Sequence, residues 1–163
     1  MQNTALACSL LVFSFIGCGL VIEEAETPLV RSQASGPVTE PYVQVTSVTV
    51  EPSAIHKTQK PNKASVIVQI MLRGQAPANP EAIVEVGTYS SDSPNNELKY
   101  ENPTRTVSLV QGVTVVKFKA ETTPKTFQGK IKVAATLGGA TKGIDIKDSE
   151  PKDYLADLTV LDP

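Results

Sequence analysis

The chain has 163 residues, about the length of one domain. Its 15 Lys and Arg residues are balanced by 17 Asp and Glu residues, so there is no basic excess that would neutralise nucleic-acid phosphates, and we expect no nucleic-acid partner. One His and two Cys exclude a zinc site built from Cys and His alone, and we expect no metal ion or cofactor.

Residues 6–16 form an apolar stretch, LACSLLVFSFI, near the start of the sequence. Eleven residues are too few for a helix that crosses a ~30 Å hydrocarbon core, which needs ~20 residues. The stretch does have the length of the hydrophobic region of a secretory signal peptide, and small residues follow it directly. The sequence therefore predicts export from the cytoplasm.

The residues that end this stretch, Phe15-Ile16-Gly17-Cys18, resemble the lipobox of bacterial lipoproteins. The resemblance implies that residues 1–17 are removed as a signal peptide and that the thiol of Cys18 is lipidated. The protein would then be anchored in the membrane of a bacterial cell envelope. We expect the outer membrane, because the Asp that retains lipoproteins at the inner membrane is replaced here by Gly19. An ordinary secretory signal with a secreted product, or an uncleaved anchor, is the alternative.

Residues 18–42 are expected to form an acidic, flexible tether behind the lipidated Cys18. Residues 19–42 contain four Glu, one Arg and three Pro, and no apolar period of 3.6 or 2 runs through them.

From Val43 onward the pattern changes to short β-branched segments separated by turn residues, and no window shows the apolar stripe of a helix. Several segments alternate with the period of two that half-buried strands require. The valines of the first segment change parity between Val45 and Val48, so we expect a β-bulge near Thr46 and Ser47. The expected strands are residues 43–50, 64–72, 81–89, 97–101, 104–110, 113–120, 129–137 and 155–161.

The segment 129–139, GKIKVAATLGG, resembles the penultimate strand of bacterial immunoglobulin-like modules, and Leu158-Thr159-Val160 resembles their last strand. The stretch from Val107 to Phe118 is similar to the strand pair that precedes them. The resemblance implies that residues 43–163 form an all-β, immunoglobulin-like antiparallel sandwich of seven or eight strands. In such folds the first strand often changes sheets at a bulge. A small β-barrel is the alternative.

No catalytic constellation is apparent. The domain's one histidine, His56, has no nucleophile or orienting group near it in sequence, and we expect it in a solvated loop among lysines. A hydrolase that uses only carboxylates would need two of them close together, with Asp92, Glu97 and Glu101 as candidates. Tyr89 and Tyr100 flank a polar loop and are the remaining candidates for a sugar site.

The longest expected loop, residues 138–154, is the candidate surface for a partner. We expect a short extra hairpin through Ile144 and Ile146 and then a solvated turn, and the lysines among the acidic residues oppose a metal site. The candidate contact residues are Lys142, Asp145, Lys147, Asp148, Glu150 and Asp153.

Together these features predict an envelope-anchored lipoprotein that acts as a non-catalytic binding or adhesion module, with a protein or an envelope polymer as its partner. Two alternatives stay open. One is a structural subunit of an envelope complex or filament, and the other is the carboxylate-based hydrolase. The oligomeric state does not follow from the sequence.

Overall fold

A computed structural model describes residues 39–93, 96–147, 150 and 154–162. The chain divides into two units, Met1–Ala34 and Ser35–Pro163, and every described residue belongs to the second. The predicted signal peptide, Cys18 and most of the predicted tether lie outside the described residues. Among those described, no helix is long and apolar enough to cross a membrane.

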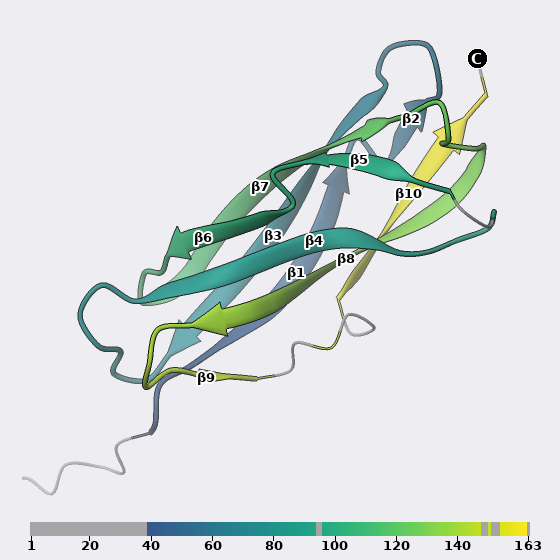
Figure 1. Ribbon diagram of the computed structural model, residues 1–163. Coiled ribbons are helices and arrows are strands. Elements are labelled where there is room, and N and C mark those ends of the chain that lie inside the picture. The colour runs from purple at the N-terminus through teal and green to yellow at the C-terminus, as the bar shows by residue number, and fades with distance from the viewer. Residues whose placement is uncertain (1–38, 94–95, 148–149, 151–153, 163) are drawn as a thin grey trace, which may run out of the picture. The chain divides into compact units, whose positions relative to one another are not determined.

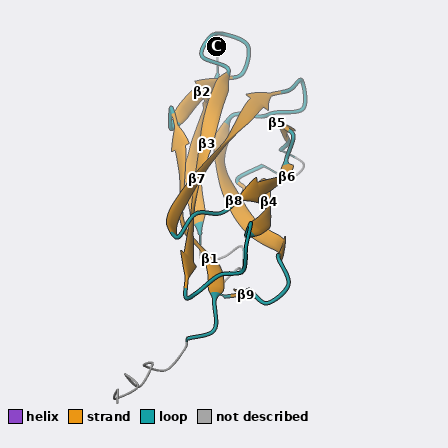
Figure 2. Ribbon diagram, turned by 90° about the vertical axis from the view of Figure 1, so that its left-hand side faces the viewer, coloured by secondary structure: helices purple, strands orange, loops and turns teal. Residues whose placement is uncertain are grey.

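The described part of the chain is built from ten strands in two five-stranded sheets that face each other (Figures 1 and 2). Sheet A has the order β5-β7-β3-β1-β9, and sheet B has the order β2-β10-β8-β4-β6. The protein is thus all-β, with the immunoglobulin-like sandwich fold rather than a closed barrel. The strands are β1 (Tyr42–Glu51), β2 (Ala54–His56), β3 (Lys63–Arg73), β4 (Glu81–Ser91), β5 (Leu98–Glu101), β6 (Thr104–Ser108), β7 (Gly112–Thr122), β8 (Gly129–Ala140), β9 (Asp145–Ile146) and β10 (Leu155–Leu161).

The core lies between the two sheets and is filled by the alternating apolar residues that the sequence predicted. On β3, the four side chains from Val66 to Leu72 that share a face are each exposed by 1% or less. The corresponding face of β8, from Ile131 to Leu137, is buried as well, and so is Phe118 of β7. Burying one such aliphatic or aromatic side chain contributes about 1.5–3 kcal/mol, so this core supplies the main stabilisation.

The predicted bulge in β1 is confirmed, because the pairing of β1 with β3 shifts register between Val45 and Ser47. The expectation that the strand changes sheets at this bulge is wrong. β1 stays in sheet A over its whole length, and the chain enters sheet B only with β2, after Pro52. β2 then pairs in parallel with β10, with Ile55 opposite Val160.

A sheet change occurs instead between β5 and β6. β5 pairs with β7 in sheet A, and β6 pairs with β4 in sheet B. Only Asn102 and Pro103 separate the two strands, and Asn102 has a φ of 51°, a backbone conformation that Asn tolerates better than most residues. This segment therefore ties the two sheets together along one side of the sandwich.

Candidate functional site

The predicted partner loop lies at the end of the sandwich where β1 begins. Its first residues, up to Ala140, extend β8, and Asp145 and Ile146 form β9. The expected extra hairpin through Ile144 and Ile146 is wrong, because β9 pairs in parallel with β1 as an edge strand of sheet A. The Lys147 backbone N–H donates a 2.9 Å hydrogen bond to the Val43 carbonyl, which continues the pairing.

The candidate contact residues of this segment are only partly described. The Lys147 ammonium lies 4.2 Å from the centre of the Tyr42 ring, which is a cation–π contact. Lys142 is exposed, and Glu150 has an interaction of its own. Asp148 and Asp153 lie outside the described residues. Nothing in this geometry tests a role in partner binding, which stays a prediction.

The opposite end of the sandwich, which we call the apex, is formed by residues 52–62, 92–93, 96–97 and 123–128 (Figure 1). Three buried polar side chains, Asn96, Thr122 and Thr126, join these segments. Thr122 donates its hydroxyl to the Lys57 carbonyl at 2.9 Å, and Thr126 donates its hydroxyl to the Glu97 carbonyl. Buried polar groups that are fully hydrogen-bonded rigidify the structure around them, so the apex is a fixed surface.

Asn96 makes the most specific of these contacts. Its side-chain amide donates to the Phe127 carbonyl at 3.0 Å, and its side-chain oxygen accepts the Phe127 N–H at 2.9 Å. The neighbouring Thr126 hydroxyl accepts the Thr123 N–H at 2.7 Å and so closes the turn before Phe127. Both backbone groups of Phe127 are thereby held while its ring is free to contact solvent.

The ring of Phe127 is 47% exposed, although Asn96 binds both the N–H and the carbonyl of this residue. The Lys57 ammonium lies 5.3 Å from the ring centre, within the range of a cation–π contact. Lys60 and Lys125 add exposed positive charge to the same end, and Lys125 pairs loosely with Glu97 at 3.8 Å. A rigid, exposed aromatic ring beside cations is the kind of group that anchors a partner.

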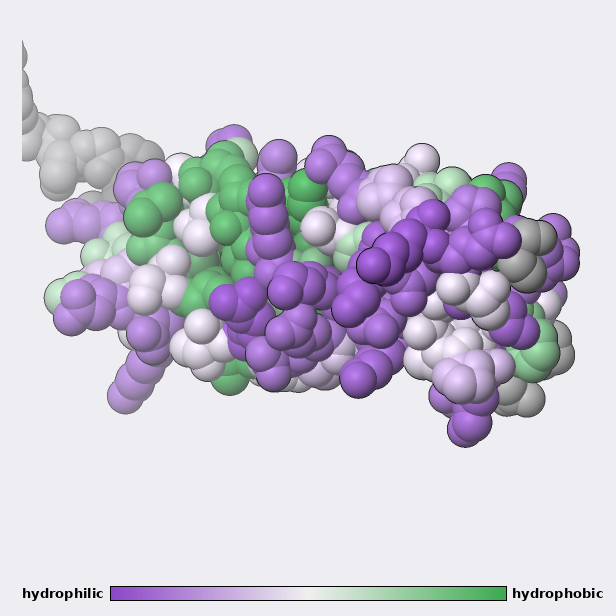
Figure 3. Space-filling view, turned by 90° about the horizontal axis from the view of Figure 1, so that it is seen from above, coloured by the Kyte–Doolittle hydropathy of each residue, from purple (hydrophilic) through white to green (hydrophobic). Residues whose placement is uncertain are grey.

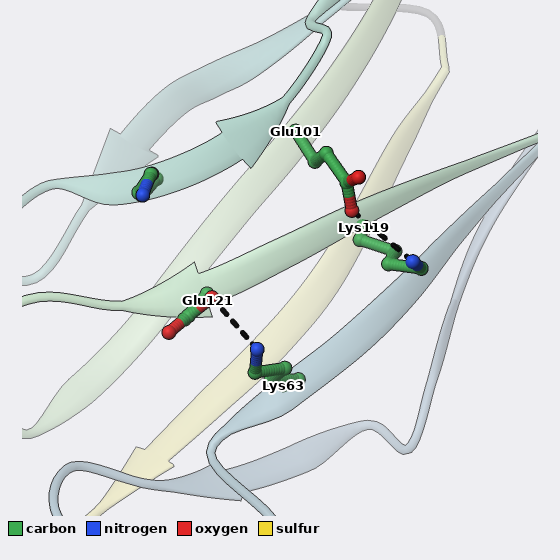
Figure 4. Close-up of a pocket in the computed structure, with 5 residues that line it drawn as sticks. Lys63, Glu101, Lys119 and Glu121 are labelled. Carbon is green, nitrogen blue, oxygen red and sulfur yellow. Dashed lines mark ion pairs between the residues drawn. The ribbon is translucent and has the colours of Figure 1, made fainter.

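Next to the apex, the outer face of sheet A has a shallow depression of about 460 Å³ lined by charged residues. Two ion pairs cross it, Lys63 with Glu121 at 3.0 Å and Lys119 with Glu101 at 3.1 Å (Figure 4). All four side chains are well exposed to solvent, so each pair contributes little, about 0–1 kcal/mol. The two ion pairs neutralise four of the lining residues, and Lys99 adds one further positive charge.

The three carboxylates considered for hydrolysis each have a separate structural contact. Asp92 accepts the backbone N–H of Lys130 at 3.0 Å, while Glu97 and Glu101 face different lysines. Within the described ranges, no three His, Cys, Asp or Glu residues come together as they would around a metal ion. Glu101 shares the depression on sheet A with Glu121, but a lysine engages each of these two carboxylates.

The remaining sequence candidates are separated by the fold. His56 belongs to β2 and is not in a loop, and its Nδ1 lies 3.4 Å from the Asp162 carbonyl. Tyr89 is half exposed, whereas Tyr100 is turned inward and shares a 3.0 Å hydrogen bond with the Thr88 hydroxyl. Burial raises the pKa of Tyr100, and this hydrogen bond opposes the rise. The two tyrosines therefore do not form one sugar-stacking platform.

Sequence reasoning missed both Phe127 and Asn96. Phe127 sits in the stretch TTPKTFQG, which has no strand period, and an aromatic residue inside such a turn was the available signal. Asn96 follows Pro94 and Asn95 and reads as an ordinary turn residue, so its buried role had no signal in the sequence.

No protein family and no curated protein matches the sequence. The solved structures that are similar in fold include the following two. The crystal structure of the apo form of the Calx CBD1 domain is 15% identical, covers 75% of this chain and 98% of its own, and has a TM-score of 0.42. The crystal structure of CBD12 from CALX1.2 is 18% identical, with a TM-score of 0.39. That match covers 72% of this chain but only 44% of the other. At this identity the likeness concerns the fold alone.

Proposed function

We propose that the protein is a non-catalytic binding module that contacts its partner through the apex. The observation that supports this most directly is the fixed, half-exposed ring of Phe127. Because Asn96 and Thr126 already hold the turn in place, a partner that covers the ring pays little conformational entropy for ordering the site. An aromatic anchor with this preorganisation is typical of binding hot spots.

The cations around the ring suggest the chemistry of the partner. Lys57 contacts the ring, and Lys60 and Lys125 lie exposed at the same end of the sandwich, so the complementary surface carries acidic groups about an apolar side chain or ring. An acidic protein segment or an anionic envelope polymer has this character, and the experiment below separates them.

We further propose that the domain is held at the bacterial envelope by lipid on Cys18. The lipobox-like sequence is the support for this proposal. A chain that reaches the sandwich through the residues before Tyr42 joins it at the end opposite the apex. Two or three acyl chains would give stable attachment, since each buried CH₂ adds about 0.8 kcal/mol.

Site-specific photo-crosslinking in intact cells tests the binding surface. A photoreactive phenylalanine analogue at position 127 should capture the partner, while the same analogue at Tyr89, which is equally exposed on another face, should not. Phe127→Ala should weaken binding of the captured protein, or of purified peptidoglycan, by tenfold or more. Capture at Lys142 in place of position 127 would favour the loop predicted from sequence and contradict the apex.

The intact mass of the protein extracted from membranes tests the anchor. A mass equal to residues 18–163 plus acyl chains is expected, and Cys18→Ser should abolish the lipid addition. An unmodified amino terminus would contradict the proposal for Cys18, but it would not affect the proposal that the apex binds a partner.

A further inference from the structure

The first half of β7 is an open strand edge. β5 pairs only with Lys119–Thr122 of β7, so the edge before Lys119 lies beyond the end of β5. The Thr122 N–H donates to the Asn62 carbonyl, which means that even-numbered residues of β7 hydrogen-bond to β3 and odd-numbered residues face away from it. Val113, Val115 and Lys117 therefore direct their backbone groups outward.

The backbone at this edge has one protein contact within the described part of the chain: Arg105 donates to the Lys117 carbonyl at 2.9 Å. The Arg105 guanidinium also lies 5.7 Å from the centre of the Phe118 ring. This side chain covers one end of the edge and leaves the backbone of Val113 and Val115 accessible. Unpaired strand edges readily accept another strand unless charge or a bulge protects them.

Apolar side chains flank the open edge. Val110, Val113 and Val115 are 58%, 45% and 53% exposed, although valine is usually buried. Figure 3 looks onto the side of the molecule where β5, β6 and β7 lie, and it shows hydrophobic surface gathered in one half beside a ridge of hydrophilic residues. The edge therefore combines free hydrogen-bonding groups with exposed apolar surface.

We propose that two copies of the chain pair in antiparallel fashion along residues 113–117 of β7. The open stretch is bounded by the turn at Gly112, whose φ is +92°, and by β5 at Lys119. Two such stretches overlap fully in a single antiparallel register, with Val115 opposite Val115 of the second copy. The pairing joins sheet A of both copies into one continuous sheet.

The charges on the strand fit this register. Val113 of one copy lies opposite Lys117 of the second, so the two lysines are kept apart and the aliphatic part of each covers a valine. The N–H of Val113 takes the place of Arg105 at the Lys117 carbonyl. A second copy thus satisfies the edge without placing like charges opposite each other, which is why we assign the edge to a copy of this chain rather than to another protein.

Sedimentation velocity of the full chain in detergent tests the association. We expect a concentration-dependent dimer whose dissociation constant rises about tenfold or more in Val115→Lys, because two new cations would meet at the centre of the junction. Ile83→Lys makes the same exchange on the exposed face of β4 in sheet B and should leave the dimer intact. A chain that stays monomeric at all concentrations, or a dimer unaffected by Val115→Lys, overturns the proposal.

Cysteine crosslinking tests the register in a chain that also carries Cys8→Ser and Cys18→Ser. Hydrogen-bonded residues opposite each other have Cα atoms about 5.5 Å apart, within reach of a disulfide. V115C should therefore crosslink to itself on oxidation. V113C should crosslink with K117C when the two variants are mixed, and far less when alone. Equal self-crosslinking of V113C and V115C would refute the register.

Discussion

Replacing Asn96 with Ala should loosen the apex and lower the stability of the whole domain. Asn96 is 5% exposed, and it makes two hydrogen bonds to Phe127, at 2.9 and 3.0 Å. Alanine can make neither bond, so the N–H and the carbonyl of Phe127 lose their partners in a place that water reaches poorly.

The cost follows from these two contacts. Each hydrogen bond contributes about 0.5–1.5 kcal/mol net, and a buried group left without a partner adds to the loss. We expect the free energy of unfolding to fall by about 2–3 kcal/mol. For a domain of this size, that change lowers the melting temperature by roughly 10 °C. Urea denaturation followed by circular dichroism measures the free energy, and calorimetry measures the melting temperature.

Asn62→Ala is the matched control. Asn62 lies in the same end of the sandwich, and its backbone carbonyl, which alanine retains, accepts the Thr122 N–H. The free energy of unfolding of the Asn62→Ala variant should differ from that of the wild-type by about 0.5 kcal/mol or less. If Asn96→Ala were as mild as Asn62→Ala, the hydrogen bonds of Asn96 would not be what holds Phe127, and the argument for a fixed apex would fail.

Three further substitutions test the fold. Gly74→Ala should unfold the domain or lower its stability by several kcal/mol, because the φ of Gly74 is +80° and an added Cβ would lie 2.7 Å from Pro41. Gly143 has a similar φ of +89° but open space around it, so Gly143→Ala should lower the stability by only about 1–2 kcal/mol. Thermal denaturation measures both. The raised pKa of Tyr100 means that the folded state holds the neutral phenol more strongly than the unfolded state does. The stability that comes from this difference is fully present below pH 10 and is lost as the pH rises through the raised pKa. Tyr100→Phe should remove that part of the loss of stability at high pH, and at pH 7 it should lower the stability by about 1 kcal/mol because the hydrogen bond to Thr88 is lost. If urea titrations gave the same dependence of stability on pH for the wild-type and the variant, the pKa of Tyr100 would not be the cause.

Much of the fold was predictable because its long strands each bury one face. The alternation in β3, β7 and β8 marks the core side chain by side chain, and the change of parity in β1 marks its bulge. β2 was missed as a strand because three residues are too short to show a period, and β9 was expected in a local hairpin rather than beside β1. Their positions depend on partners far away in the sequence, which no local pattern encodes.

The candidate site was harder to predict for a related reason. The apex depends on side chains such as Asn96 and Thr126 that bond to backbone groups about 30 residues away. In the sequence both look like polar turn residues. The long loop after β8 attracted attention through its length and charge, but length alone says nothing about which end of a sandwich a loop occupies.

The pairing of β2 with β10 has a consequence for how the protein folds. Ala54 and Thr159, which lie opposite each other, are separated by about a hundred residues, and β10 also lies between β2 and β8. Sheet B cannot close until β10 has left the ribosome, and contacts between such distant segments make folding slow. The strand order that completes the core therefore postpones the closing of sheet B until β10 has been made. If the protein is exported as proposed above, the chain would still be open when it crosses the membrane.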